Sequence, residues 1–171
     1  EIVCKEGHSA ITVRRIADLT GYSYTNLYYY FKDIHTLLWY LRLDMIEDMI
    51  LEFSEVDFTY DSPVEELIAI FQYYMTYFIE RPNIFRFFYY YPFIRPKDDN
   101  KYDELELRLS KMWQKSFIKL VNNNLILESD VEIIAKTIIY SIQGRIMLSL
   151  SSNGRMTVDE INLELKRIIC F

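Results

Sequence analysis

Hydrogen-bonding side chains are concentrated in the stretch SYTNLYYYFK, residues 23–32. This stretch carries hydroxyl, amide and phenol groups where a solvated helix face normally shows Glu, Lys and Gln. Such groups can hydrogen-bond to base edges and to phosphate oxygens. Residues 9–32 contain one acid, Asp18, against three basic side chains, Arg14, Arg15 and Lys32, so this stretch does not repel phosphate. The chemistry that these residues could supply is contact with a nucleic acid.

Two short helices separated by Gly21 must position these side chains. In the first helix Ala17 is small enough for a second helix to cross close to it. Gly21 can adopt the left-handed conformation that ends a helix, and Ser23 can cap the next one. In that second helix Leu27 and Phe31 are four residues apart and both face the core, which leaves the polar residues outside. The pattern predicts a helix-turn-helix.

A helical hairpin that packs against another protein is the alternative interpretation of this stretch. The position of the glycine, the small alanine and the acid-poor face together favour DNA. This preference depends on the geometry of the motif rather than on its charge.

The segment from Gly7 to Leu38, with ITVRRIA, then TGYS, then NLYYYFKD and a following LL, resembles the DNA-binding domain of tetracycline-repressor (TetR) family transcriptional regulators. The resemblance covers about the first quarter of the chain by motif and the remainder only by architecture. The family often has a lysine where this chain has Ile34, so that phosphate contact is not expected here. The resemblance implies DNA contacts by Thr12, Arg14, Ser23, Tyr24, Thr25 and Asn26, and phosphate contacts by Tyr29, Tyr30 and Lys32.

The composition is that of an ordinary folded protein. The chain has 171 residues, of which 51% are hydrophobic and 26% charged, enough for one or two cores. The formal net charge is −6, but residues 1–42 hold 5 basic and 4 acidic residues, whereas residues 43–171 hold 14 and 21. The acidic excess therefore lies away from the motif. Cys4 and Cys170 lack metal-type spacing, which favours free thiols in a reducing cytoplasm over a disulfide. Charges interrupt the apolar runs, so neither a signal peptide nor a membrane span is expected.

An enzyme is the alternative from another class, and the sequence offers it little. The only histidines, His8 and His35, have no second ligand at metal-type spacing, so we expect surface or capping positions and no metal site. The adjacent Glu65 and Glu66 suit the first turn of a helix better than a catalytic pair. The sequence contains neither a glycine-rich phosphate loop nor an elbow-type serine motif. We therefore expect a protein that is not an enzyme and uses no cofactor.

Further helices are expected on both sides of the motif. EIVCKEG suits the last turns of a supporting helix, which implies roughly ten more residues before Glu1. Asp33 can cap a connector helix through LLWYLRLDMIEDMILEF. Capping boxes begin three later helices, at Ser62, Ser129 and Thr157, and Asn153 with Gly154 ends the second of these.

Between those helices we expect a short aromatic segment, NIFRFFYYYPF, and an amphipathic helix from about Tyr102 to Asn122. The predicted division is a helix-turn-helix domain over residues 1–38, with its first helix truncated, and an effector-binding and dimerisation domain over residues 39–171.

Residues 63–124 hold most of the chain's 15 tyrosines and 11 phenylalanines taken together. Large flat rings leave gaps, so we expect a pocket for an apolar or aromatic small molecule. A plain aromatic core explains any individual ring equally well. The predicted lining is Phe71, Tyr74, Phe78, Phe88, Trp113, Phe117, Tyr140 and Gln143.

The last two helices carry apolar residues on more sides than one neighbour can cover. Gly144 costs about 1 kcal/mol relative to alanine in a helix, which a closely approaching backbone would explain. The final helix has a seam of coiled-coil type at Val158, Ile161, Leu165 and Ile168. Packing within one subunit is the alternative, but a palindromic operator requires two DNA-binding domains, one for each half-site. The predicted dimer interface is Ile139, Gly144, Ile146, Ile161, Leu165 and Ile168.

Together these patterns predict an all-α protein with an N-terminal helix-turn-helix DNA-binding domain and a C-terminal helical ligand-binding and dimerisation domain. The family resemblance implies a homodimeric repressor in a bacterial cytoplasm, at the nucleoid, that leaves its palindromic double-stranded operator when a small effector binds. The alternative is a helix-turn-helix protein without a small-molecule effector that acts through protein–protein contacts.

Overall fold

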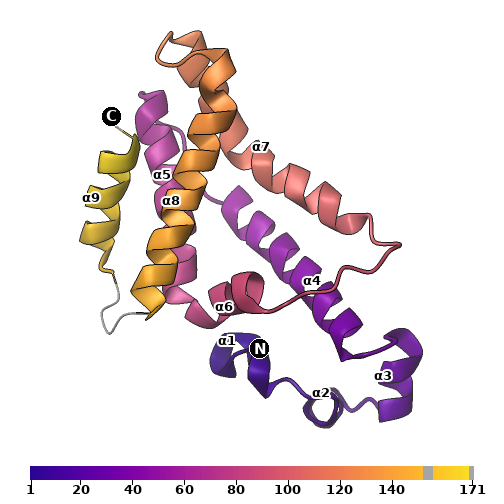
Figure 1. Cartoon of the computed structure of the whole chain (residues 1–171). Helices are drawn as coiled ribbons and strands as arrows, with labels where there is room; N and C mark the ends of the chain where they lie inside the picture. The colour runs from indigo at the N-terminus through magenta and orange to yellow at the C-terminus, as the bar shows by residue number, and fades with distance from the viewer. Residues whose placement is uncertain (152–155, 170–171) are drawn as a thin grey trace. The chain divides into compact units, whose positions relative to one another are not determined.

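The computed structural model describes residues 1–151 and 156–169, and all regular structure in this part of the chain is helical, as predicted (Figure 1). The predicted helix end at Asn153 and Gly154, like Cys170, lies outside the described residues. In chain order the helices are α1 (Ile2–Glu6), the 3₁₀ turn η1 (His8–Ala10), α2 (Val13–Thr20), α3 (Tyr24–Tyr30), α4 (Ile34–Ser54), α5 (Pro63–Glu80), α6 (Pro82–Tyr90), α7 (Lys101–Asn122), the 3₁₀ turn η2 (Glu128–Asp130), α8 (Val131–Ser151) and α9 (Val158–Ile169).

The chain forms two compact units, each built from two separate segments. Unit 1 comprises Glu1–Glu55 and Arg81–Arg108, and unit 2 comprises Val56–Glu80 and Leu109–Phe171. The predicted boundary at residue 38 is a functional division between the DNA-binding motif and the rest, and it stays a prediction.

Unit 1 is organised along α4. Asp33 caps this helix as predicted, because its Oδ1 accepts a hydrogen bond from the Thr36 N–H at 2.7 Å. That hydrogen bond lowers the pKa of Asp33. The helix buries an apolar side that consists of Leu38, Trp39, Leu43, Ile46, Met49, Ile50 and Phe53.

Residues 81–108 are fastened to the polar side of α4 by ion pairs. Arg81 lies 3.0 Å from Glu52, and Lys101 lies 2.8 Å from Glu47. Hydrogen bonding to Lys101 lowers the pKa of Glu47, so this pair remains ionised at neutral pH. The second segment of unit 1 is thereby held along much of the length of α4.

Most of the aromatic segment expected at residues 83–93 lies in a helix, α6, which ends at Tyr90. Pro82 occupies its first turn, where a missing N–H removes no helical hydrogen bond. Asn83 Nδ2 donates to the Cys4 carbonyl at 3.1 Å and so joins α6 to α1. After α6, the Tyr91 hydroxyl lies 2.8 Å from His35 Nδ1 at the start of α4.

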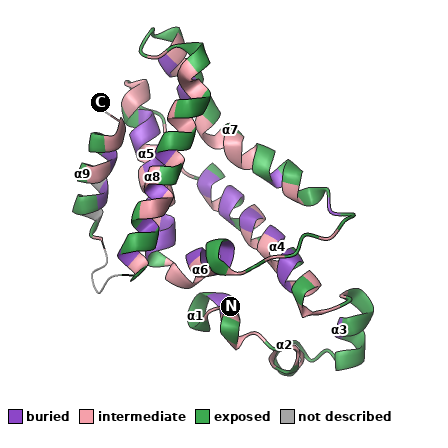
Figure 2. Ribbon diagram, in the orientation of Figure 1, coloured by how far each residue is buried: buried purple, intermediate pink, exposed green. Residues whose placement is uncertain are grey.

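In unit 2, α5 packs against both α8 and α9 (Figure 1). Figure 2 shows buried residues along α5 and many exposed residues on α8 and α9. The capping box predicted at Thr157 is confirmed: Thr157 N–H donates to Glu160 Oε2 at 2.7 Å, and Glu160 N–H donates to Thr157 Oγ1 at 3.3 Å. The box predicted at Ser129 is wrong, because Ser129 lies in η2 and donates to Asp130, its neighbour.

A buried carboxylate joins α5 to α7 within unit 2. Glu66 is only 4% exposed, and its Oε1 accepts a hydrogen bond from Ser116 Oγ at 2.8 Å. Its other oxygen accepts from Lys119 Nζ. Burial raises the pKa of Glu66, but the hydrogen bonds from Lys119 and Ser116 outweigh that effect and hold the pKa below its ordinary value.

We expect Glu66→Gln to lower the free energy of unfolding by about 1 to 3 kcal/mol at pH 7, because the amide cannot replace the charged acceptor. The pKa of Glu66 is lowered by folding, so its contribution is present above the unfolded pKa of about 4.3 and is lost as the pH falls below it. Urea unfolding at pH 7 and at pH 3.5 should therefore show a difference from the native protein that shrinks in acid. The exposed neighbour supplies the control, since Glu65→Gln should change stability little; equal effects would contradict the role of Glu66.

Candidate nucleic-acid interface

Side-chain caps define where the two helices of the motif begin. Thr12 Oγ1 accepts a hydrogen bond from the Arg15 N–H at 3.1 Å at the start of α2. Ser23 Oγ accepts from the Asn26 N–H at 3.2 Å at the start of α3. The first-turn residues of α3 are therefore fixed in helical geometry by the cap that the sequence predicts.

The turn between the helices depends on Gly21. Its φ of 73° and ψ of 4° are left-handed, and its N–H donates to the Ala17 carbonyl at 2.9 Å. A Cβ added at Gly21 would meet nothing within 4 Å. The requirement for glycine is therefore conformational, as predicted, and does not come from crowding.

α3 is held in place by very little burial. Leu27, at 8% exposure, is the only buried residue in this helix. Tyr29 is 83% exposed and Tyr30 is 71% exposed, and their rings meet edge to face with centroids 5.2 Å apart. All residues of α3 other than Leu27 are exposed, so most of the helix surface is open to solvent.

The residues predicted to contact DNA are all exposed. They lie on α2, on α3 or at the N-caps of these helices, except Lys32, which follows Phe31, the C-cap of α3. The structure brings together Thr12, Arg14, Ser23, Tyr24, Thr25, Asn26, Tyr29, Tyr30 and Lys32 on one short stretch of chain. Their roles in DNA binding stay predictions.

The basic residues of the motif divide into two kinds. Arg15 forms an ion pair with Glu6 of α1, and the carboxylate of Glu6 partly neutralises the charge of Arg15. Arg14 and Lys32 are exposed and form no ion pair with a described residue. They are the cations available to phosphate groups near α3.

Tyr22 was not among the predicted contact residues. It lies in the turn just before α3, is 56% exposed, and its N–H donates to Thr20 Oγ1 at 3.4 Å. Its exposure directly before the Ser23 cap makes it a further candidate contact residue, and its position in the sequence is the signal that could have indicated this.

The residues predicted to line an effector pocket belong to both units, and their role stays a prediction. In unit 2 the rings of Phe71 and Trp113 stack with centroids 6.1 Å apart, and Tyr74 meets Phe78 edge to face at 5.0 Å. Phe88 belongs to α6 of unit 1. The remaining members are the buried Phe117, the exposed Tyr140 and the half-buried Gln143.

The residues predicted for the dimer interface lie at different depths. Ile146, Ile161 and Leu165 are fully buried, so the seam of α9 faces its own subunit. The side chain of Val158 lies outside the described part of the structure. Ile139, Gly144 and Ile168 are half-buried, and a Cβ at Gly144 would meet nothing within 4 Å. No described residue of this subunit makes the close approach expected at Gly144.

Within the described residues, one helical stretch, Glu128–Ser151, is long and apolar enough to cross a membrane by length and composition. Its apolar stretch has a mean hydropathy of 1.2, and 22% of that stretch is buried. A single such helix is weak evidence for a span, because a core helix of a soluble protein passes the same test.

Both histidines contact Tyr91 rather than a metal site. The ring of His8 meets that of Tyr91 edge to face, with centroids 5.3 Å apart, and His35 makes the hydrogen bond described above. Among the described residues there is no group of three or more His, Cys, Asp or Glu that could hold a metal ion.

No family model and no curated protein sequence matches the chain. Among solved structures, it is similar to a Clostridium perfringens protein named as a proposed regulator of fatty acid metabolism. The identity is 18% and the TM-score is 0.64, over 99% of this chain and 92% of that chain. This likeness extends over both units and supports the all-helical fold.

We expect Gly21→Ala to weaken the motif, because an alanine at positive φ costs about 1 kcal/mol or more. Asparagine tolerates this conformation, so Gly21→Asn should be milder although its side chain is larger. Amide hydrogen exchange of residues 24–30 measures the effect as faster opening of α3. If the two variants behaved alike, the requirement at Gly21 would not be conformational.

Proposed function

We propose that the protein is a sequence-specific DNA-binding transcriptional regulator of the TetR type, with α3 as its recognition helix. The observation that carries the proposal is that α3 buries Leu27 alone and leaves its hydroxyl, amide and phenol groups open to solvent. A short helix with this surface fits a major groove, where its first turn can reach base edges. The fold likeness to a protein named as a regulator adds support.

We further propose that the protein acts as a repressor in a bacterial cytoplasm. A small apolar or aromatic effector would release it from its operator. The paired rings of Phe71 with Trp113 and of Tyr74 with Phe78 support an effector site in unit 2, since a flat ligand can stack on such rings. An effector need only prefer the conformation that cannot bind DNA. A coupling of about 1 to 3 kcal/mol gives roughly a 5- to 150-fold loss of operator affinity.

The polar surface of α3 predicts two classes of variant. We expect Asn26→Ala and Arg14→Ala to relax operator choice, because a base-edge contact contributes about 1 to 3 kcal/mol of discrimination. We expect Tyr29→Phe and Lys32→Ala to weaken binding to all sequences alike, with the lysine variant lowering the salt slope by about one unit. Fluorescence anisotropy with operator and random duplexes at several salt concentrations separates the two classes.

The Leu51→Ala variant controls for surface changes, because this exposed leucine lies on α4 away from the motif. Unchanged binding to both duplexes in all four variants would show that α3 does not contact DNA. It would leave a helix-turn-helix that serves protein contacts.

We propose that the protein is a homodimer and that α8 supplies the interface. This helix has two opposite apolar faces at helical spacing. One face is buried in its own subunit and contains Ile138, Ile142, Ile146 and Ser149. The other contains exposed side chains around Gly144, namely Ile133, Thr137, Tyr140, Met147 and Leu148. An exposed apolar helix face of this length is typical of a protein interface.

We expect Gly144→Leu to convert dimers to monomers, because a large side chain would hold the partner helix away. The same change should leave each subunit folded, since a Cβ there meets nothing within 4 Å and leucine favours a helix over glycine by about 1 kcal/mol. Sedimentation velocity measures the assembly, and Gln114→Leu on the exposed side of α7 is the matched control. A dimer that survived Gly144→Leu would have its interface elsewhere.

A further inference from the structure

Unit 2 contains a cavity of about 610 Å³ where the ends of several helices meet. Figure 1 shows the first turn of α5, the end of α7, the start of α8 and the end of α9 in this region. Ligand sites of small molecules typically occupy about 300 to 1,000 Å³. The lining consists of Val64, Leu67, Leu120, Leu125, Ile126, Ile133, Ile134, Thr137, Ile138, Ile168 and Ile169.

The turn after α7 brings its side of the wall into place. Asn124 has a left-handed φ of 55°, and its N–H donates to the Val121 carbonyl at 2.9 Å. The Leu125 N–H then reaches back to the Leu120 carbonyl at 3.0 Å. These two hydrogen bonds end α7 and reverse the direction of the chain. Leu120 at the end of α7 and Leu125 after the turn both line the cavity.

Among the described residues that line the cavity, all but Thr137 have aliphatic side chains. The Thr137 hydroxyl already donates to the Ile133 carbonyl at 2.7 Å. None of these described residues carries a charged side chain or an aromatic ring. A charged ligand would lose its hydration here without compensation, and a flat ring would find no ring to stack on.

The cavity has a closed floor and an open rim. Leu67, Leu120 and Ile138 are buried at its floor, whereas Leu125 and Ile133 are more than half exposed at its edge. A ligand can therefore bury an apolar part and leave a polar end in water.

We propose that this cavity binds a flexible alkyl chain, with the polar end of the ligand outside the protein. The inference goes beyond the proposed effector site, because none of the rings predicted to line that site contributes to this cavity. It also does not depend on DNA binding, which can be measured separately.

The direct test uses 1-decanol as the probe and protein labelled at isoleucine δ1-methyl groups. Six of the lining residues are isoleucines, so NMR reports on the cavity itself. We expect saturable shifts at Ile126, Ile133, Ile134, Ile138, Ile168 and Ile169, and no shift at Ile11 or Ile16 beside the motif. Naphthalene, a flat apolar probe, should bind about tenfold more weakly or worse.

Two neighbouring substitutions provide the matched pair. Ile126 lines the cavity and Leu127 does not, although both lie between α7 and α8. We expect Ile126→Trp to weaken decanol binding about tenfold or more by filling the space, and Leu127→Trp to leave it unchanged. Val64→Phe fills the cavity from α5 and serves as the second variant should Ile126→Trp unfold, which circular dichroism reports.

Four results would overturn the proposal. They are shifts at methyl groups outside the lining, equal decanol affinity in the filling and control variants, tighter binding of naphthalene than of decanol, and no binding up to the solubility limit of decanol. Ile133 also lies on the open face of α8, so a shift of its methyl group alone when the protein is diluted reports the proposed dimer and leaves the cavity proposal intact. A shift of the other lining methyls on dilution would be a fifth overturning result, because a second copy of the chain would then cover the cavity in place of a ligand. Operator binding measured on the same samples shows separately whether the regulator function holds.

Discussion

The left-handed backbone at Gly21 is the constraint on which the candidate DNA-binding surface depends. α3 buries one side chain, Leu27, so burial alone contributes only a few kcal/mol to its position. Its direction is therefore set at its ends, by the turn at Gly21 and the cap at Ser23. A helix positioned by its ends can leave nearly its whole surface to a partner.

The support for this surface comes from two distant parts of the chain. α1 is joined to α6 through Asn83 and Cys4, and α4 is joined to residues 81–108 through ion pairs at Glu47 and Glu52. The motif is thus part of a larger compact unit, Glu1–Glu55 with Arg81–Arg108. A conformational change in residues 81–108 has a direct physical route to α4, the helix that follows the motif.

Local features were predictable from the sequence, and long-range packing was not. The caps at Ser23, Asp33 and Thr157 and the turn at Gly21 depend on residues within a few positions, so the pattern alone indicates them. The spacing of Leu165 in α9, by contrast, suits a partner subunit and its own α5 equally well. Ring counts indicated an aromatic pocket, whereas the aliphatic cavity depends on which helix ends meet. That meeting is set by tertiary packing and leaves no local signal.

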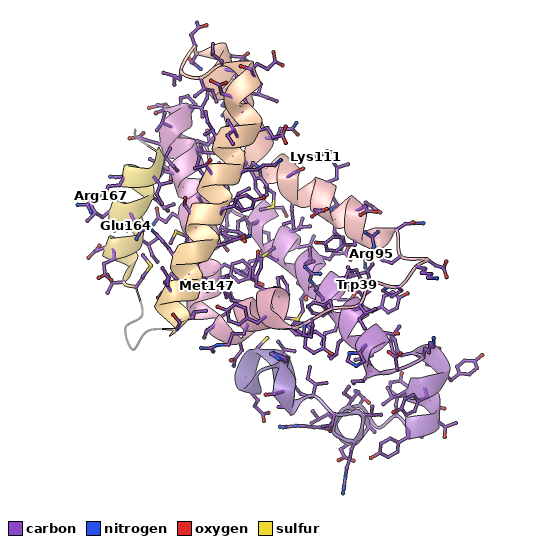
Figure 3. All side chains as sticks on the ribbon, viewed as in Figure 1. Trp39, Arg95, Lys111, Met147, Glu164 and Arg167 are labelled. Carbon is purple, nitrogen blue, oxygen red and sulfur yellow. The ribbon has the colours of Figure 1, made fainter. Side chains whose placement is uncertain are left out.

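The proposed dimer would cover the exposed face of α8, and a protein partner suits this face better than a lipid bilayer does. Arg145 lies within this helix and pairs with Glu164 of α9 at 2.8 Å, while Arg167 lies 3.9 Å from the same carboxylate (Figure 3). Arg145 lies within the apolar stretch of α8, and a charged side chain inside a helix that spans hydrocarbon would be costly. The opposite side of α8 is already packed in its own subunit, so the open side around Gly144 is the part left to cover. A second copy of the same helix would meet it with the same glycine, which lets two backbones approach closely about a two-fold axis.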